Sequence, residues 1–90
     1  MRSRTTERFR KLFRALPKEV REQGREAYRL FARDPYHPSL RFKPIEGNLY
    51  SARITLDYRA VGVRDGDEII WFWVGSHSDY DKLLTQLRKK

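Results

Sequence analysis

Residues 58–74 read YRAVGVRDGDEIIWFWV, two apolar runs on either side of a turn signal. Asp65-Gly66 between such runs is a strong short-range signal for a two-residue β-hairpin turn. We therefore predict antiparallel strands over 58–63 and 68–74. The second strand is the most apolar stretch of the chain and is expected to be buried.

The predicted turn also sets a register for the hairpin. Arg59 is then opposite Phe72, and Trp71 and Trp73 share the other face of the sheet, since side chains alternate along a strand. Alternating apolar residues predict a further strand over 49–56. The sheet is thus expected to be small and antiparallel, with three to four strands.

Helical spacing of apolar residues precedes and follows the predicted sheet. Thr5 or Thr6 is expected to cap a first helix, and Pro17 suits the first turn of a second helix. A short helix over 79–90 closes the chain. These elements predict an α+β fold in one domain of 90 residues, with an N-terminal helical hairpin packed on the sheet.

The formal net charge of +8 is concentrated at one end of the chain. Residues 1–33 contain eleven basic and four acidic residues, for a net charge of +7. Arg21, Arg25 and Arg29 recur every four residues and form a basic stripe along the second predicted helix. Such polarity indicates an acidic partner, either nucleic acid or an acidic protein segment. A well-solvated pair of helices is the plainer alternative.

Several classes of protein are disfavoured by composition. The chain has no cysteine, which excludes disulfides, zinc ribbons and cysteine nucleophiles, and its two histidines lack the paired spacing of a metal site. No apolar run approaches the roughly 20 residues that cross a bilayer. The Arg-rich N-terminus has no signal-peptide hydrophobic region. We therefore expect a cytoplasmic protein with no membrane association, no metal and no small-molecule cofactor.

A polar segment, Gly75-Ser76-His77-Ser78-Asp79-Tyr80, follows the apolar strand directly. Glycine and serine let the backbone turn abruptly, so the side chains after them are held at an edge of the sheet. A histidine has an unperturbed pKa of about 6.5 and can act as an acid or a base near neutral pH. His77 is thus a candidate catalytic group, with helix capping or a loop hydrogen bond as its plainer alternative.

The order of several segments is more specific than any one of them. The segments are Leu16-Pro17-Lys18-Glu19-Val20, Asp34-Pro35-Tyr36-His37-Pro38, Gly47-x-Leu49-Tyr50-Ser51-x-Arg53-Ile54, Asp57-Tyr58-Arg59 and Val74-Gly75-x-His77. Together they resemble the RelE/ParE superfamily of toxins from bacterial type II toxin–antitoxin systems. Members are small basic proteins that either cut messenger RNA, often in the ribosomal A site, or inhibit DNA gyrase. Each is neutralised by a cognate antitoxin that wraps around it.

The resemblance implies roles for three residues. The segment Gly75-Ser76-His77-Ser78-Asp79 is similar to the Gly-Thr-His-Ser-Asp segment of the YafQ toxins, whose histidine acts in RNA cleavage. By this likeness His77 is the expected general acid. Asp57 or His37 is the expected general base, because YafQ toxins use an aspartate before an aromatic residue and a His-Pro after the second helix. A turn role for Asp57 and a loop-organising role for His37 are the plainer alternatives.

The resemblance also implies contacts to RNA. Arg59 is similar to an arginine of the RelE branch that contacts the scissile phosphate, or it is a rim arginine paired with Glu68 or Asp57. Arg53 stands where YafQ toxins have a second histidine, which suggests a phosphate contact in place of an acid–base group. The remaining expected RNA contacts are base stacking by Tyr36 or Tyr80 and basic contacts from Arg21, Arg25, Arg29 and Lys43.

Three functions remain open from the sequence. A metal-independent, ribosome-dependent messenger RNA endoribonuclease would have the ribosome, messenger RNA and an antitoxin as partners and would need His77. A gyrase inhibitor would bind DNA gyrase and would tolerate His77→Ala. A degenerate member would bind only its antitoxin. Superfamily members usually begin with an apolar strand, but Met1–Thr5 is polar, so this edge of the sheet is expected to be weak or missing.

Overall fold

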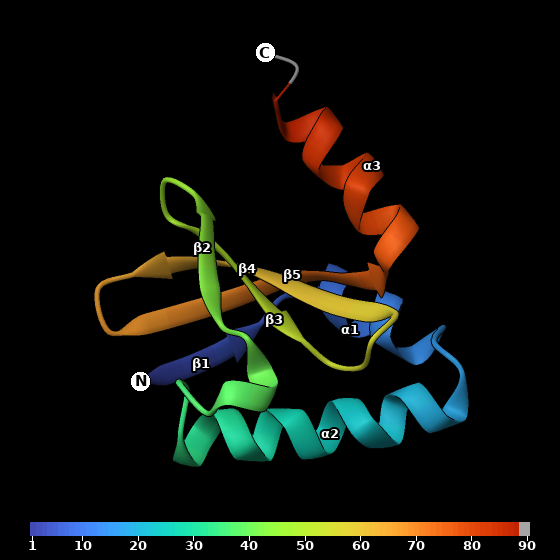
Figure 1. Cartoon of the computed structure of the whole chain (residues 1–90), viewed down its shortest axis with the longest axis horizontal. Helices are drawn as coiled ribbons and strands as arrows, with labels where there is room; N and C mark the ends of the chain where they lie inside the picture. The colour runs from blue at the N-terminus through green and yellow to red at the C-terminus, as the bar shows by residue number, and fades with distance from the viewer. Residues whose placement is uncertain (89–90) are drawn as a thin grey trace.

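The predicted hairpin lies at the centre of a larger sheet than the sequence indicates. A computed structural model describes residues 1–88, which contain five strands in the spatial order β1-β5-β4-β3-β2 (Figure 1). The strands are β1 (Arg2–Thr5), β2 (Lys43–Glu46), β3 (Leu49–Arg53), β4 (Tyr58–Asp65) and β5 (Glu68–Ser76). β1 runs parallel to β5, and the other neighbours are antiparallel. The sheet is therefore mixed, with one or two strands more than expected.

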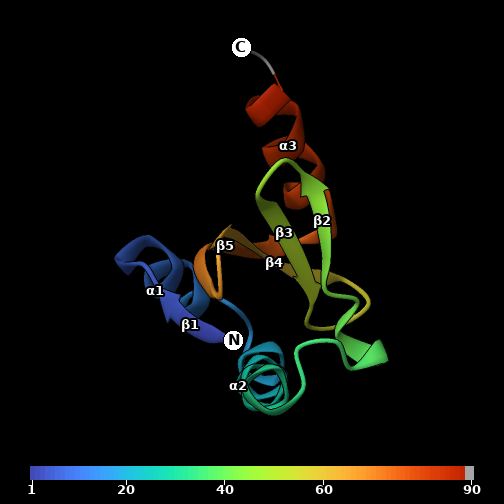
Figure 2. The same cartoon turned by 90° about the vertical axis from the view of Figure 1, so that its left-hand side faces the viewer.

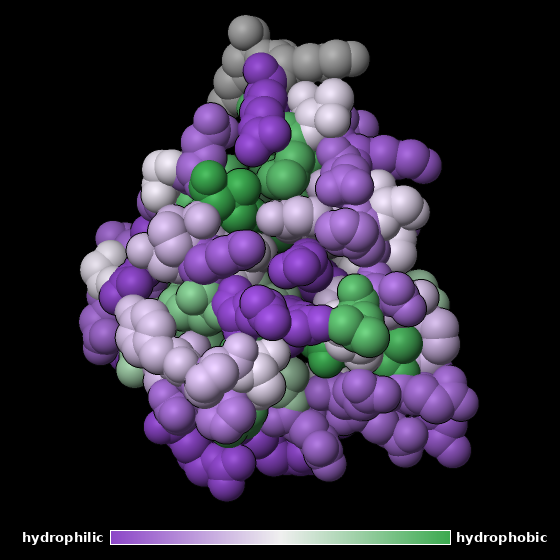
Figure 3. Space-filling model, viewed as in Figure 1, coloured by the Kyte–Doolittle hydropathy of each residue, from purple (hydrophilic) through white to green (hydrophobic). Residues whose placement is uncertain are grey.

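Helices cover both faces of this sheet, which confirms the α+β fold. The helices are α1 (Glu7–Arg14), α2 (Lys18–Arg33) and α3 (His77–Arg88), with a short 3-10 helix η1 (Pro38–Leu40) after α2. Figure 2 shows α2 and α3 on opposite sides of the sheet. In Figure 3 the surface over α2 is mostly hydrophilic, whereas apolar surface lies beside α3 and at the β3–β4 loop.

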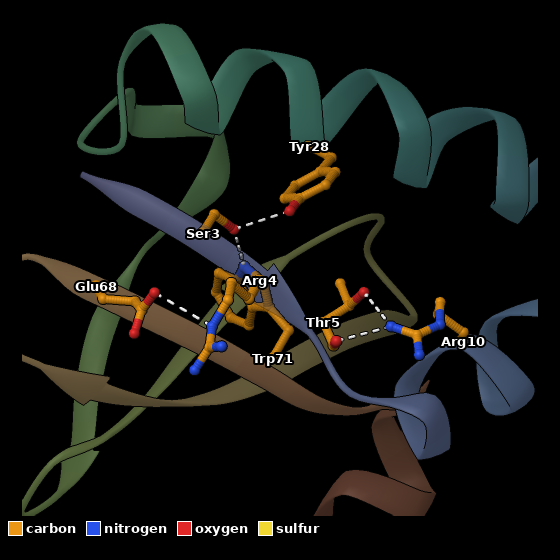
Figure 4. Close-up of polar contacts among 7 residues, drawn as sticks. All are labelled: Ser3, Arg4, Thr5, Arg10, Tyr28, Glu68 and Trp71. Carbon is orange, nitrogen blue, oxygen red and sulfur yellow. Dashed lines mark hydrogen bonds and ion pairs between the residues drawn. The ribbon is translucent and has the colours of Figure 1, made fainter.

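The polar N-terminal segment forms β1, so the expectation of a weak or missing edge is wrong. Side chains of β1 form hydrogen bonds and an ion pair with residues of α2 and β5 (Figure 4). The Ser3 hydroxyl accepts a hydrogen bond from Trp71 Nε1 at 3.0 Å and donates one to the Tyr28 oxygen at 3.1 Å. Arg4 Nε lies 3.2 Å from a Glu68 carboxylate oxygen. Hydrogen bonding to α2 and β5 thus replaces the apolar contacts that an N-terminal strand would otherwise make.

The hairpin turn differs from the prediction by one position. Asp65 pairs with Glu68, so Gly66 and Asp67 are the turn residues instead of Asp65 and Gly66. Gly66 has a φ of +61°. The first turn residue needs a positive φ in both favoured hairpin turns, and glycine adopts it without a Cβ clash. The position of this glycine therefore determines the register.

A β-bulge in β5 corrects the prediction for the two tryptophans. Trp71 pairs with Gly62 and Trp73 pairs with the adjacent Val61, so Phe72 has no partner in β4. One extra residue moves every later side chain of that strand to the other face. Trp71 and Trp73 therefore lie on opposite faces of the sheet and not on one face. The same bulge places Arg59 opposite Gly75 instead of Phe72.

Each tryptophan belongs to a separate core. Trp71 lies in the larger core, between the sheet and the α1–α2 hairpin, whose buried residues are Leu16, Val20, Phe31, Leu40, Phe42, Ala52, Ala60, Ile69, Trp71 and Val74. Trp73 lies in the smaller core under α3, with Val61, Tyr80 and Leu83. α3 is thereby fixed over the end of the central hairpin.

Two further boundaries differ from the sequence analysis. β3 ends at Arg53, whereas the predicted strand continued to Leu56, whose side chain is 77% exposed. The loop over 54–57 closes when the backbone N–H groups of Ile54 and Thr55 donate to the Tyr58 carbonyl. α3 begins two residues before the predicted helix over 79–90, and residues 89–90 lie outside the described residues. α1 begins after Thr6, which caps it as predicted.

Candidate functional site

One corner of the sheet brings together residues from three separate segments. Arg53 ends β3, Asp57 and Arg59 flank the start of β4, and His77 is the first residue of α3. Arg53 and Arg59 are direct Cα partners across the β3–β4 ladder, so their side chains leave the same face. The His77 backbone N–H donates to the Asp57 carbonyl at 2.6 Å. The four residues therefore share one edge of the molecule, which we call the Arg59 corner.

Arg59 has hydrogen-bonding capacity that the rest of residues 1–88 does not use. Its guanidinium carbon lies 5.5 Å from the centre of the Tyr80 ring. Its Nε is buried and has no hydrogen-bond partner within that range. The expected alternative partner Glu68 pairs with Arg4 instead. Because buried donors are normally satisfied, an orphaned guanidinium nitrogen indicates a place for an anionic ligand.

Gly75 makes room for this arrangement on the neighbouring strand. It is the direct β5 partner of Arg59. A Cβ at Gly75 would lie 2.7 Å from Cζ2 and 2.9 Å from Cη2 of the Trp73 ring. The absence of a side chain therefore leaves room for the Trp73 ring, whose centroid lies 6.4 Å from that of Tyr80, the ring under Arg59.

His77 is exposed and lies on the ring that supports Arg59. Its imidazole stacks near the Tyr80 ring, with centroids 6.1 Å apart and planes 18° from parallel. The cap of α3 comes from Ser76, whose hydroxyl accepts from the Asp79 N–H at 3.2 Å. Ser76, and not His77, therefore caps α3. The buried Tyr80 ring positions both an imidazole and a guanidinium, which leaves it little surface for stacking on a base.

Asp57 contributes differently through its backbone and its side chain. Its carbonyl binds the start of α3, and its N–H donates to the Thr55 hydroxyl at 3.1 Å. The residue as a whole is exposed. Asp57 is therefore both the turn residue that the sequence allows and a carboxylate at the Arg59 corner.

The opposite end of β4 holds Tyr36, away from the Arg59 corner. Arg64 Nη1 donates to the Tyr36 hydroxyl at 3.2 Å and to the Tyr50 hydroxyl at 3.4 Å, and its Nε donates to the Gly66 carbonyl. The hydrogen bonds to Tyr36 and then Tyr50 raise the pKa of Arg64. Since a strand rises about 3.3 Å per residue, Arg59 and Arg64 are roughly 17 Å apart along β4.

His37 follows Tyr36 and acts as the loop organiser that the sequence allows. Its Nδ1 accepts a hydrogen bond from the Ser39 N–H at 3.2 Å and lies 2.9 Å from the Ser39 hydroxyl. His37 is thereby the N-cap of η1. The structure therefore does not bring His37 to His77.

The four basic residues predicted to contact RNA have different surroundings in the structure. Arg21 donates to the Leu16 carbonyl in the α1–α2 turn, and Arg25 lies 5.6 Å above the Phe13 ring. These two arginines join α1 to α2. Arg29 lines a polar groove of about 480 Å³ beside α2. Lys43 is exposed on the edge strand β2.

Sequence reasoning named Arg29 and Arg53 but not the groove that both of them line. Arg33 lines it as well, and the remaining lining residues are Gln23, Glu26, Ala27, Leu30, Ser39, Leu40 and Ile54. They come from α2, η1 and the end of β3, which only the fold brings together. The four-residue spacing that includes Arg33 is the one signal in the sequence.

Residues 1–88 contain no group of three or more His, Cys, Asp or Glu side chains that could hold a metal ion. None of the helices within those residues is long and apolar enough to cross a membrane.

Comparison with known proteins identifies one family. A model of the ParE-like toxin domain matches residues 18–82. A search of curated proteins gave no significant match. Among solved structures, the fold is similar to YafQ from E. coli, at a TM-score of 0.70 and 11% identity, with 89% of this chain and 98% of that chain covered.

Two other solved structures share the fold. One is RelE in the RelB-RelE antitoxin-toxin complex from Methanococcus jannaschii, at a TM-score of 0.70 and 24% identity, with 87% of this chain and 95% of that chain covered. The other is the YoeB/ParE toxin from Agrobacterium tumefaciens, at a TM-score of 0.65 and 19% identity, with coverages of 86% and 99%. At these identities the likeness concerns the fold.

Proposed function

This chain belongs to the ParE-like toxin domain family, and on that premise we propose that it cuts messenger RNA as a metal-independent, ribosome-dependent endoribonuclease. The observation that carries the proposal is the Arg59 corner. Arg59 has a buried Nε without a hydrogen-bond partner in residues 1–88, and Arg53, Asp57 and His77 lie around it.

Cleavage of RNA by its own 2′-hydroxyl needs few catalytic groups, and the residues of the Arg59 corner can supply them. The ribose 2′-oxygen attacks the adjacent phosphorus, the bond from phosphorus to the 5′-oxygen breaks, and the products are a 2′,3′-cyclic phosphate and a 5′-hydroxyl. A base takes the proton of the 2′-hydroxyl, and an acid protonates the leaving 5′-oxygen. Cationic donors stabilise the charge that develops on the phosphoryl oxygens.

Each group of the Arg59 corner has one task in this scheme. Arg59 and Arg53 bind the non-bridging phosphate oxygens, because a guanidinium stays charged and donates in a fork. His77 donates the proton to the 5′-oxygen. Asp57 accepts the proton of the 2′-hydroxyl. Tyr80 positions both Arg59 and His77 through its ring.

The structure changes the proposed assignment of two other residues. His37 is left out of the base position because its ring nitrogen Nδ1 is taken up by Ser39 as the N-cap of η1. Tyr36 is 63% exposed beside Arg64. It is thus proposed to stack on a base several nucleotides away from the cleaved bond.

A gyrase-inhibiting function is the second candidate, and the match to the ParE-like toxin domain favours it. Such an inhibitor needs binding surfaces and no acid–base residue. It would keep its toxicity when the imidazole of His77 is removed.

A cognate antitoxin is the proposed protein partner. The similar solved structures include toxin–antitoxin complexes, among them the RelB-RelE complex from Methanococcus jannaschii and the DinJ-YafQ complex from E. coli. The net charge of +8 suits an acidic antitoxin segment.

Induced expression in bacteria tests the nuclease proposal. Wild-type protein, His77→Ala and the exposed neighbour Ser78→Ala are compared for growth and, by primer extension, for cuts in messenger RNA. We expect cuts and growth arrest with wild-type protein and Ser78→Ala, and neither with His77→Ala. Growth arrest without cuts, or equal toxicity of wild-type protein and His77→Ala, would contradict the nuclease proposal and favour the gyrase alternative.

A further inference from the structure

An apolar cavity of about 200 Å³ lies between the α1–α2 hairpin and the sheet. Gly24 and Ala27 line it from α2, and Ala52 and Ala60, which are direct Cα partners, line it from β3 and β4. These small residues leave space among larger lining residues, which include Phe9, Phe13, Phe31 and Trp71. An apolar cavity of about 150 Å³ binds benzene, so this one has room for an aromatic ring or a branched alkyl group.

A chain of hydrogen bonds ends at the mouth of this cavity. The Trp71 indole N–H can only donate, so the Ser3 hydroxyl accepts from it at 3.0 Å and donates onward to the Tyr28 oxygen at 3.1 Å (Figure 4). Tyr28 lines the cavity and is 43% exposed, so the cavity reaches solvent beside it. In this direction the chain ends on Tyr28, whose own O–H proton can be donated to a ligand.

A positive charge lies beside that donor. Arg25 also lines the cavity and precedes Tyr28 by three residues on α2, a spacing that places both side chains on one side of the helix. None of the ion pairs formed within residues 1–88 includes Arg25. The lining residues, all of which belong to that range, include no Asp or Glu. The mouth therefore offers a guanidinium and a hydroxyl donor to an anion.

The cavity and its mouth together select one class of ligand. The cavity disfavours a polar body, because burying a polar group without a hydrogen bond is unfavourable. The mouth disfavours an amine, whose charge would repel that of Arg25. A carboxylate has acceptor oxygens for both the guanidinium and the Tyr28 hydroxyl. An apolar monocarboxylate meets both conditions, whereas a nucleotide would bury the polar edges of its base.

We propose that this cavity binds a small aromatic or branched aliphatic monocarboxylate. The apolar group of the ligand lies among the alanine and phenylalanine side chains, and its carboxylate binds Arg25 and Tyr28. Side chains alternate along a strand, so Arg59 is on the opposite face of the sheet from its neighbour Ala60, which lines the cavity. The site is therefore separate from the Arg59 corner and does not depend on the proposed function.

Nuclear magnetic resonance of the full chain tests the site with an internal control. The chain has two tryptophans, of which Trp71 lines the cavity and Trp73 lies in the smaller core under α3. The ¹⁵N-labelled protein is titrated with benzoate, phenylacetate and 3-phenylpropionate, which differ in the distance from ring to carboxylate. We expect at least one acid to move the indole N–H signal of Trp71 saturably, with a Kd of about 1 mM or less. The signal of Trp73 should stay in place.

Two comparison compounds separate the contributions of ring and charge. Phenethylamine has the ring of 3-phenylpropionate with a positive charge, and acetate has the carboxylate without a ring. Each should bind at least tenfold more weakly than the best of the three acids. Toluene has a ring and no charge, so its binding reports the apolar cavity alone.

Single substitutions on α2 assign the carboxylate. Arg25→Gln and Tyr28→Phe should each weaken the best acid at least fivefold. Arg29→Gln is the control, because it removes the same charge one turn further along α2, from a residue that lines the polar groove and not the cavity. It should change the affinity less than twofold. Toluene should bind wild-type protein and all three variants alike, which shows that the cavity is intact in each.

Three outcomes overturn the proposal. The first is no saturable movement of the Trp71 signal with any of the three acids. The second is equal affinity for 3-phenylpropionate and phenethylamine. The third is a loss in Arg25→Gln and Tyr28→Phe no greater than that in Arg29→Gln. Because every measurement is made without RNA, ribosomes or cleavage, a failure here is distinct from a failure of the nuclease proposal.

Discussion

Arg59 and Arg64 are two arginines of the same strand that the fold treats in opposite ways. Arg64 donates to two tyrosine hydroxyls and a backbone carbonyl, so its guanidinium is used to hold the fold together. Arg59 rests on the Tyr80 ring with a buried Nε that has no partner in the described chain. An arginine with its donors satisfied is part of the framework, whereas one with donors in reserve is prepared for a ligand.

The contrast extends to the residues around each arginine. His77 and Asp57 lie at the Arg59 corner, whereas His37 directly follows Tyr36, whose hydroxyl accepts a hydrogen bond from Arg64, and binds Ser39 through its ring. The chain therefore has one histidine at the proposed site and one that is part of a loop. The molecule provides a matched control for every test of its proposed site.

Replacement of each histidine by alanine should give the largest difference in cleavage rate. His77→Ala removes the proposed general acid, which typically contributes about 10²–10⁴-fold to a rate, so cleavage of ribosome-bound messenger RNA should fall by that factor. His37→Ala should leave the rate within about threefold and lower stability by about 1 kcal/mol, because it removes the cap of η1. Equal loss in the two variants would break the comparison.

Two glycines offer a comparison of stability at the same two ends. Gly75→Ala places a methyl group 2.7 Å from the Trp73 ring, so a buried ring must move, at a cost of about 1–3 kcal/mol. Gly66→Ala meets no atom within 4 Å but keeps a φ of +61°, a strain of about 1 kcal/mol. Urea denaturation measures both variants. A greater loss for Gly66→Ala would show that the Trp73 ring is less tightly packed against Gly75 than described.

Replacement of the two supporting tyrosine rings should have a smaller effect. Tyr80→Leu removes the surface under Arg59 and His77, and a contact of this kind is worth about 0.5–1 kcal/mol, or a two- to fivefold loss of cleavage rate. Tyr50→Leu removes the ring under Arg64 and should leave the rate unchanged. Single-turnover kinetics at saturating enzyme separates the two. A change in rate for Tyr50→Leu alone would reverse the proposed roles of the ends.

The Arg4–Glu68 ion pair should matter least. Glu68→Gln removes a partly exposed ion pair at 3.2 Å, which is worth about 0–1 kcal/mol. Because Glu68 pairs with Arg4, cleavage should be unchanged, and thermal unfolding should detect the small loss of stability. Reduced cleavage by Glu68→Gln would indicate that this carboxylate reaches Arg59 after all.

The central hairpin could be predicted because its signals are local. Asp65-Gly66 between alternating apolar residues indicated the turn, and the helices followed from their apolar spacing and the Thr6 cap. The bulge at Phe72 could not be predicted. The run over 69–74 is apolar at every position, so its sequence gives no alternation that would distinguish a bulged strand from a regular one. β1 depends on hydrogen bonds to α2 and β5, which exist only after the chain has folded.

The candidate site shows the same division between local and tertiary signals. His77 and Asp57 were identified from short segments, and the structure brings them together. The pairing of Arg53 with Arg59 depends on the four-residue loop over 54–57, which the predicted strand over 49–56 concealed. His37, in the loop before η1, binds Ser39, which is the plainer role that the sequence already allowed for it.

Cleavage of ribosome-bound messenger RNA by Arg59→Ala and Arg64→Ala, measured side by side with purified protein, tests the central claim most directly. Loss of one preorganised donor to a developing charge typically costs about 10²–10³ in rate, so Arg59→Ala should be slower by that factor. Arg64→Ala should melt at a lower temperature and still cut within about threefold of the wild-type rate. Equal rates for the two variants, or a greater loss for Arg64→Ala, would contradict the assignment of the chemistry to the Arg59 corner.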